Sequence, residues 1–344
     1  MPLSSVPTST GAGRSCGSPL GRAQIRCAGW VISRCVGFGR GSVRHTVIAV
    51  VMSRAGAFEQ LRRNLELTGL QQSTVAARQE DLRGALAGDL AVRDSFLTGS
   101  YVRQTLIGPL AKADVDVVVV LDTRTYAGRG ARSVLEMVRR VLLRTYPSTP
   151  EISRSGQAVT VSFRNFAVDV VPAFKQWHWW HGDGYRICDS GSDGWIFTNP
   201  KKHAEISSKV NLFHKGAVVP CIKQLKAWNR TVNRPLRSFH IEVLAWQIFD
   251  TSWWWPSQMG CDWENVRYFF DKARESIPGR QPDPAGTGKD VGAYLTGQAI
   301  SNAVSKVTTA YERCVRAERE ADAGRLDAAH EAYRRVFGSY YPAT

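Results

Sequence analysis

Two aspartates in the middle of the chain carry the clearest chemical signal. Asp114 and Asp116 stand one residue apart, directly before an apolar, mostly β-branched run at 117–121. Such a run predicts a buried strand, and because side chains alternate faces along a strand, both carboxylates point the same way. Adjacent carboxylates repel each other and are costly to bury, and a bound cation removes both costs. The pair therefore predicts a metal site.

A turn upstream of the aspartates is suited to phosphate. Ser100 follows Gly99 and precedes Asp114 by fourteen residues. Glycine lets the backbone approach phosphate closely, the residues after it can offer free N–H groups, and the serine hydroxyl can donate a hydrogen bond. Together, the turn and the aspartates predict that a nucleoside triphosphate binds here with divalent metal.

A third carboxylate, Asp169, lies within the apolar segment 166–171, where an acid has no structural purpose. If this segment is a strand beside 114–121, three carboxylates converge on one face. They could then hold two Mg²⁺ or Mn²⁺ ions, one orienting the triphosphate and the other activating an attacking hydroxyl. The alternative is that these acids are ordinary strand-end residues paired with Lys112 or Arg164.

The hydrophobic pattern predicts the elements that would position these groups. Helical spacing is found in 57–90, with the second helix of this region over 73–87, and again in 131–145. Alternation predicts two strands, at 158–163 and 166–171, joined by a turn. This mixture of strands and helices indicates an α/β palm with a mixed sheet.

Downstream of Pro172 the pattern becomes helical. The predicted helical segments are 201–249, 260–278 and two helices within 296–337, separated by a break at Gly324. The chain therefore divides into a catalytic portion at 52–195 and a helical lobe at 196–344.

Residues 1–51 differ from the rest of the chain. They are rich in glycine, serine and arginine, with six arginines and no acid. A transit peptide has a similar composition, but no sustained amphipathic face is present. We expect this segment to be disordered, or to be a gene-calling artefact with Met52 as the true start.

The charge and cysteine content restrict the class of protein. The net charge is +15, and residues 52–344 still carry +9, which suits polyphosphate or nucleic-acid ligands, although a generally solubilising charge gives the same number. The seven cysteines form no CxxC pair, which favours free thiols in a reducing compartment. No apolar run approaches the roughly 18 residues of a membrane span, so we expect a cytoplasmic protein.

The ordered set of motifs resembles a known family. Gly-Ser, Asp-x-Asp and a later strand Asp are similar to the DNA polymerase β-type nucleotidyltransferase superfamily. Further stretches resemble its cGAS/DncV-like nucleotidyltransferases, the SMODS group that makes cyclic oligonucleotide signals. These stretches are 98–105, 169–173, 195–203, 226–228, 238–242, 283–284 with 288–290, and 332–338.

The resemblance implies a fold and a set of roles. The fold would be a polymerase-β-like palm with a helical C-terminal lobe closing over a nucleotide cleft. Asp114, Asp116 and Asp169 match the metal-binding triad, and Gly99 with Ser100 matches the turn that holds the donor triphosphate.

Three further positions are implied in the second half of the chain. Lys226 and Ser238 match a lysine and a serine of the helical lobe that contact the donor's phosphates, and Thr198 matches a position near the nucleobase. An ammonium is a point charge suited to polyphosphate, and Ser238 could lie at the N-terminus of a helix over 238–249.

The implied activity is a cyclic di- or trinucleotide synthase that joins NTPs and releases pyrophosphate. In the family, such products activate a separate effector protein in CBASS-type defence against phage, and a nucleic acid or protein activator is a further partner. Two alternatives stay open. One is a transferase that adds nucleotides to RNA or AMP to a protein, and the other is a nucleic-acid-binding module without catalysis.

Overall fold

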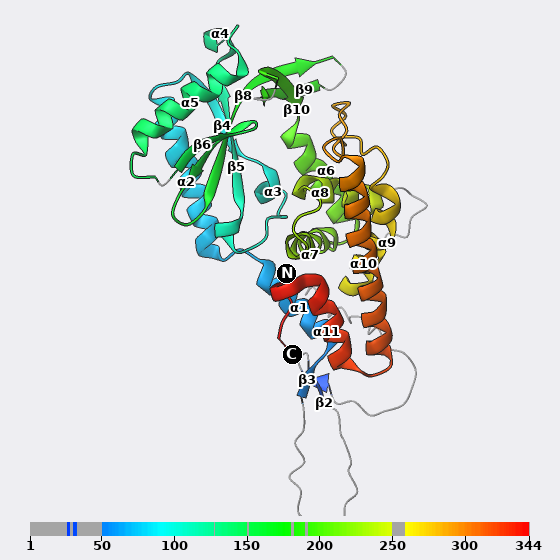
Figure 1. The fold of residues 1–344 in the computed structure, drawn as a ribbon. Coiled ribbons are helices and arrows are strands. Elements are labelled where there is room, and N and C mark those ends of the chain that lie inside the picture. Colours follow the sequence, from blue (N-terminus) through cyan, green and yellow to red (C-terminus); the bar gives the residue numbers. More distant parts are fainter. Residues whose placement is uncertain are drawn as a thin grey trace, which may run out of the picture.

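The computed structural model describes residues 26–27, 30–32, 50–126, 128–149, 151–179, 182–189, 192–249 and 259–343. A mixed sheet with its own helices lies beside a larger body of helices (Figure 1). The prediction for residues 1–51 lies largely outside the described part. Within that segment, β1 (Arg26–Cys27), β2 (Trp30–Ile32) and β3 (Val50–Met52) form a small antiparallel sheet.

The main sheet has the order β10-β9-β8-β5-β4, and a hairpin of β6 and β7 joins it through β7 and β8. The strands β5 and β8 are parallel, whereas the other pairs are antiparallel, so the predicted mixed sheet is confirmed. The bounds are β4 (Val92–Leu97), β5 (Asp114–Leu121), β6 (Glu151–Ser155), β7 (Ala158–Ser162), β8 (Ala167–His178), β9 (Gly182–Asp189) and β10 (Gly194–Thr198).

The two faces of the sheet differ because side chains alternate along each strand. Val115, Val117 and Val119 of β5 join a core with the helices α2 (Gly69–Ala87) and α5 (Ala131–Thr145). The other face carries the aspartates and faces the helical lobe (Figure 1). Three short elements complete this half: α3 (Gly99–Val102), η1 (Leu110–Lys112) and α4 (Thr123–Tyr126).

The helical lobe has one continuous hydrophobic core. Its helices are α6 (Pro200–Phe213), α7 (Val218–Thr231), α8 (Ser238–Ile248), α9 (Asp262–Ser276), α10 (Gly297–Asp322) and α11 (Leu326–Phe337), followed by η2 (Gly338–Tyr340). Helix α1 (Arg54–Leu65) also packs here, although it precedes the sheet in the sequence. Phe58 of α1 contacts the rings of Trp263 and Tyr333.

For several predicted elements, the structure confirms the residues at which they begin or end. Helix α5 spans the predicted 131–145, and Gly324, with a φ of +76°, separates α10 from α11 as expected. Others differ. Helix α2 begins at Gly69 rather than at residue 73, because Thr68, just before the helix, and Gln71, in its first turn, form a capping box.

The strand predicted to end at residue 171 was too short. Strand β8 continues past Pro172 to His178, because β9 pairs with its second half. The predicted boundary near residue 195 falls within β10. Among the described helices, none is long and apolar enough to cross a membrane.

Removing the Phe58 side chain should test how α1 packs. Phe58→Ala leaves a cavity in the helical core, and we expect a loss of about 3–5 kcal/mol in the free energy of unfolding, measured by urea denaturation. Leu70→Ala is the control, because Leu70 is 78% exposed and should change stability by less than about 0.5 kcal/mol. A similarly small loss for Phe58→Ala would contradict this packing.

Candidate active site

Parallel pairing of β5 and β8 brings the three aspartates to one face of the sheet. Asp116 lies opposite Asp169 in the register, and Asp114 lies opposite Ala167. Asp116 and Val118 share a face of β5, so the carboxylates continue the surface formed by Val118 and its neighbours, away from α2 and α5. The predicted neighbourhood of the two strands is confirmed.

This arrangement is electrostatically unfavourable for ionised carboxylates. Burial, the adjacent Asp169 and then Asp114 raise the pKa of Asp116 to about 7, while Arg103 opposes the shift. Burial also raises the pKa of Asp169, against a 2.6 Å hydrogen bond that Thr160 Oγ1 donates to its Oδ1. The alternative partner Lys112 has a side chain outside the described part of the chain, and Arg164 is not among the groups that shift these two pKa values. The site therefore has an unmet demand for positive charge.

The residues fit a divalent ion that a substrate also helps to bind. In the described part of the chain, no three histidine, cysteine, aspartate or glutamate side chains close around one point as a ready-made cage. Mg²⁺ usually keeps several waters and binds one or two carboxylates together with substrate phosphates. A row of carboxylates in which Asp114 raises the pKa of both Asp116 and Asp169 is a donor set of this kind.

The Gly99 turn lies directly against Asp116. Gly99 opens α3 with a φ of +65°, and a Cβ added there would lie 1.8 Å from Asp116 Oδ2. Thr98 N–H donates to Asp116 O at 2.9 Å, which joins the start of the turn to the strand. Glycine is therefore required both for the backbone conformation and for the approach of the carboxylate.

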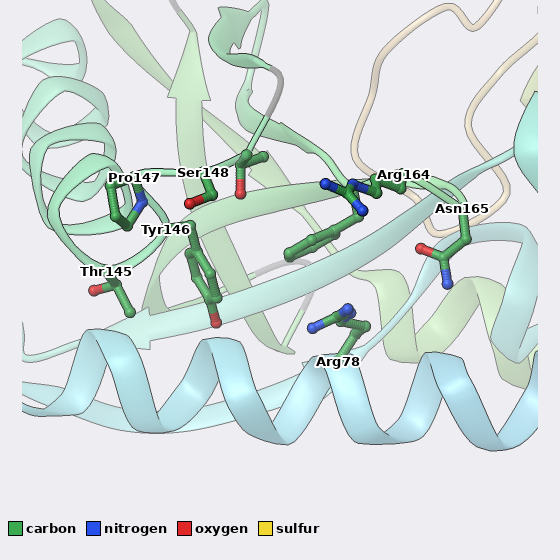
Figure 2. A pocket seen from close by; sticks show the side chains of 9 residues that line it. Arg78, Thr145, Tyr146, Pro147, Ser148, Arg164 and Asn165 are labelled. Carbon is green, nitrogen blue, oxygen red and sulfur yellow. The ribbon is translucent and has the colours of Figure 1, made fainter.

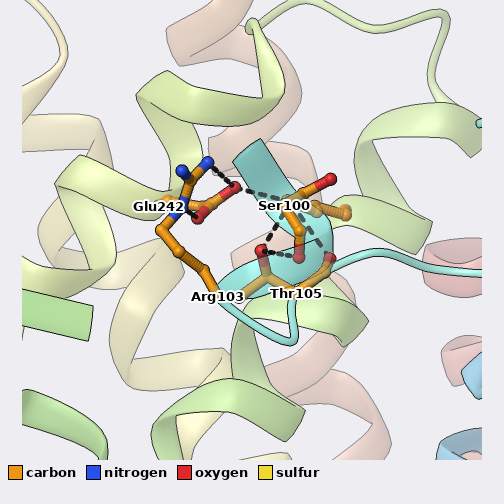
Figure 3. A network of polar contacts seen from close by, with 5 residues as sticks. Ser100, Arg103, Thr105 and Glu242 are labelled. Atoms are coloured by element: carbon orange, nitrogen blue, oxygen red, sulfur yellow. Dashed lines mark hydrogen bonds and ion pairs between the residues drawn. The ribbon is translucent and has the colours of Figure 1, made fainter. Parts of the chain in front are cut away.

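A buried ionic cluster lies behind the turn. Glu242 of α8 accepts hydrogen bonds from Arg103 Nε at 2.6 Å and from Lys226 Nζ at 2.7 Å. Lys226 also donates to Thr105 O at 3.0 Å and to Thr105 Oγ1 at 3.1 Å. Figure 3 shows Ser100, Arg103, Thr105 and Glu242 gathered at this point.

Sequence reasoning assigned no role to Arg103, Thr105 or Glu242. A signal was present, since Glu242 is an acid inside the apolar segment 238–249 and needs a buried partner. Arg103 and Lys226 are the buried partners of Glu242. Burial alone would raise the pKa of Glu242, but Lys226 and Arg103 lower it to about 2.

The remaining predicted residues are spread over the helical lobe and the sheet edge. The described hydrogen bonds of the Lys226 ammonium go to Glu242 and Thr105, so a phosphate contact would require it to exchange partners. Ser238 is exposed at the first turn of α8, which begins where it was expected. Thr198 ends β10 and pairs with Tyr185.

An aromatic pair lies on the same face of the sheet as the aspartates. Phe96 and Tyr185 have ring centroids 5.3 Å apart, and Phe96 is opposite Val118 in the β4–β5 register. Lys201 Nζ lies 4.9 Å from the Phe96 centroid. These residues were not predicted as part of the site.

A separate cavity of about 570 Å³ lies on the other side of the sheet, where α2, the end of α5 and the β7–β8 turn meet (Figure 2). The Arg78 guanidinium lies 4.3 Å from the centroid of the Phe163 ring. None of the predicted site residues lines this cavity.

Substitution of Gly99 tests its contact with Asp116. Gly99→Ala should lower the free energy of unfolding by roughly 2 kcal/mol or more, because the new Cβ meets both a positive φ and a carboxylate. The matched control is Gly84→Ala within α2, where the added Cβ would meet no atom of another part of the chain within 4 Å. There we expect the free energy of unfolding to rise by up to about 1 kcal/mol. Equal effects of the two changes in denaturant titrations would refute the contact.

The raised pKa of Asp116 predicts a pH dependence of stability. In the presence of a chelator, the folded protein keeps this proton up to about pH 7, whereas the unfolded chain loses it near the ordinary aspartate pKa of 3.8. Between these values the wild type should lose stability relative to Asp116→Asn, by about 1.4 kcal/mol per pH unit, with no further change above about pH 7. Thermal unfolding of both proteins from pH 4 to 8 measures this, and parallel curves would contradict it.

The chain has sequence similarity to known proteins. A family model of the Second Messenger Oligonucleotide or Dinucleotide Synthetase domain matches residues 52–211. A "probable cyclic nucleotide synthase" of Bacillus cereus is 26% identical over 275 residues, which cover 71% of this chain and 81% of the relative. A "cyclic AMP-AMP-AMP synthase" of an Acinetobacter species is 29% identical over 161 residues, 44% of each chain.

Solved structures share the fold. Escherichia coli CdnC with ATP superimposes with a TM-score of 0.67 at 16% identity, covering 84% of this chain and 99% of CdnC. The Vibrio cholerae cyclic AMP-GMP synthase DncV, solved with a linear intermediate, gives 0.60 at 15% identity, with coverage of 84% and 87%. The sheet-bearing part of the chain, with its carboxylates aligned across β5 and β8, is thus similar in sequence to the SMODS domain, and the fold is similar to that of the cGAS/DncV-like nucleotidyltransferases.

Proposed function

We propose that the chain is a cyclic oligonucleotide synthase. It joins nucleoside triphosphates into a cyclic di- or trinucleotide and releases pyrophosphate, as a signal in CBASS-type defence. The observation that carries the proposal is the pair Asp116 and Asp169, side by side on parallel strands with the Gly99 turn against Asp116. Relatives described as a cyclic AMP-AMP-AMP synthase and as a CBASS oligonucleotide cyclase support it.

In this proposal Asp114, Asp116 and Asp169 hold the metal. Asp116 is coupled electrostatically to both of the other carboxylates, which suits a shared set of ligands. Two Mg²⁺ or Mn²⁺ ions, when bound, neutralise the triphosphate and activate the attacking ribose hydroxyl. The carboxylates themselves must be ionised to bind them, so Asp116 must give up the proton that it retains in metal-free protein.

The turn and the helical lobe hold the donor nucleotide. Gly99 and Ser100 would bind its triphosphate, because α3 starts there and the first N–H groups of a helical turn have no partner within the helix. Lys226 and Ser238 would contact the phosphates from the lobe, and Thr198 would lie near the base. The rings of Phe96 and Tyr185 on the same face support a nucleotide ligand, since aromatic faces stack on bases.

Bond formation follows from holding the reactants in line. A ribose 2′- or 3′-hydroxyl of one nucleotide attacks the α-phosphate of the donor, the bond to the β-phosphate breaks, and pyrophosphate leaves. A second attack within the linear product closes the ring. Positioning and charge neutralisation supply most of the rate acceleration in such reactions.

The partners and the compartment are also proposals. The cyclic product would activate a separate effector protein, and a nucleic acid or a protein would act as activator, in the cytoplasm. The solved complex of Escherichia coli CdnC with HORMA-deltaN is an example of a protein partner bound to a CdnC enzyme.

Removal of two carboxylates tests the activity. Purified wild type with Mg²⁺ or Mn²⁺ should convert labelled NTPs into small, phosphatase-resistant products, and Asp114→Ala with Asp116→Ala should abolish them. Glu80→Ala with Asp81→Ala is the control, because it removes the same charge from exposed positions of α2 on the other side of the sheet. Unchanged product from the first double variant would overturn the assignment.

The nature of the labelled product separates this function from its alternatives. Mass spectrometry after incubation with all four NTPs should detect a cyclic di- or trinucleotide. A label that migrates with RNA or protein would instead indicate a macromolecular acceptor. Nucleic-acid binding that persists without metal, together with no pyrophosphate release, would indicate a binding module.

A further inference from the structure

The cluster behind the Gly99 turn joins the two halves of the molecule. Arg103 and Thr105 follow the turn in the sheet-bearing half, whereas Lys226 and Glu242 belong to α7 and α8. The side chains of Arg103, Lys226 and Glu242 are only 7%, 5% and 1% exposed. Two cations share one anion, so the cluster carries one net positive charge away from water.

The cluster is bonded to the backbone of the turn itself. Arg103 N–H donates to Gly99 O at 3.3 Å, and Thr105 N–H donates to Ser100 O at 2.9 Å. Lys226 in turn holds Thr105 through its carbonyl and its hydroxyl. Through these contacts, both residues of the Gly-Ser turn are connected to Glu242. Figure 3 shows Ser100, Arg103 and Thr105 beside Glu242.

The position of the turn has little tolerance. The Gly99 Cα lies so close to Asp116 that a Cβ would overlap the carboxylate. A movement of the turn toward the sheet would therefore displace a metal-binding carboxylate, and a movement away would withdraw the triphosphate-binding backbone from it. Catalysis of this kind loses about 100-fold for roughly 1 Å of misplacement.

Stability alone is a weak reason for such a cluster. Burying charges costs desolvation energy, and well-packed apolar residues often replace buried ion pairs at no loss. Apolar surroundings are at hand, since the Arg103 guanidinium lies 5.2 Å from the Phe239 ring and 6.0 Å from the Trp246 ring. The two-pronged contact of Arg103 with Glu242, at 2.6 and 3.2 Å, fixes a direction as well as a distance.

We propose that Arg103 and Glu242 are positioning residues that hold the Gly99–Ser100 turn in place beside Asp116, and so set the binding and reaction of the donor triphosphate. The role in catalysis rests on the proposed function. Neither side chain needs to touch the nucleotide. Lys226 completes the cluster, whether or not it also reaches phosphate.

Two variants alter the Arg103–Glu242 contact of the cluster to different degrees. Arg103→Lys keeps the charge but replaces the two-pronged contact by a single ammonium. Glu242→Gln removes the shared anion, and if it fails to fold, Arg103→Lys decides the outcome. Glu66→Gln is the matched control: Glu66 pairs with Lys223 on the same helix α7, at 2.6 Å, and has no described hydrogen bond or ion pair with residues 99–105.

The first measurement is steady-state kinetics with the full chain. We expect kcat/KM for NTP to fall about 10- to 100-fold in Arg103→Lys, with a raised KM, and to change less than about twofold in Glu66→Gln. Unaltered kinetics in a folded Arg103→Lys would overturn the positioning role. A wild type that makes no product would refute the proposed function instead.

The second measurement does not depend on activity. Amide hydrogen exchange should become faster across residues 99–106 in Arg103→Lys, with α7 and α8 unchanged, and should stay as in the wild type in Glu66→Gln. Equal acceleration throughout α7, α8 and the turn would indicate a merely structural cluster and overturn the proposal. No acceleration in the turn would do the same.

Discussion

The position of the three aspartates depends on the parallel pairing of β5 with β8. This pairing sets Asp116 opposite Asp169 in the register, and the backbone hydrogen bonds of both strands keep the two carboxylates from moving apart. A parallel neighbour requires a crossover, which runs through α5 and the β6–β7 hairpin. Helix α5 covers the apolar face of these strands, whereas β7 pairs with β8 and extends the sheet. One face is thereby packed against helices through Val115, Val117 and Val119, and the other carries the aspartates beside Val118.

The charge on that face determines what can surround it. Only a residue without a Cβ fits beside the Asp116 carboxylate, so the turn that follows β4 begins with Gly99. The positive charge that partly offsets the rise in the pKa of Asp116 comes from Arg103, four residues after Gly99. Arg103 is held by Glu242 of the helical lobe. The lobe is thus linked to the carboxylates through backbone and ionic contacts.

Local patterns in the sequence predicted the parts of this site that depend on neighbouring residues. The apolar run after Asp116, the periodicity of 131–145 and the acid within 166–171 are signals of this type, and the elements agree. Contacts between segments far apart in the sequence could not be predicted from such local patterns. Arg103 and Glu242 are 139 positions apart, α1 packs against helices near the far end of the chain, and β8 extends past Pro172 only because β9 pairs with it.

An acid within an apolar segment has two physical explanations, and Glu242 and Asp116 illustrate them. Both positions would have been singled out by the same pattern. Glu242 has Lys226 and Arg103 as partners, so its pKa falls to about 2 and its charge is already balanced within the fold. Asp116 is buried and has two further carboxylates nearby, so its pKa rises to about 7 and its charge remains unbalanced. The direction of the pKa shift therefore separates the acid whose charge is balanced within the fold from the acid whose charge needs a bound cation to balance it.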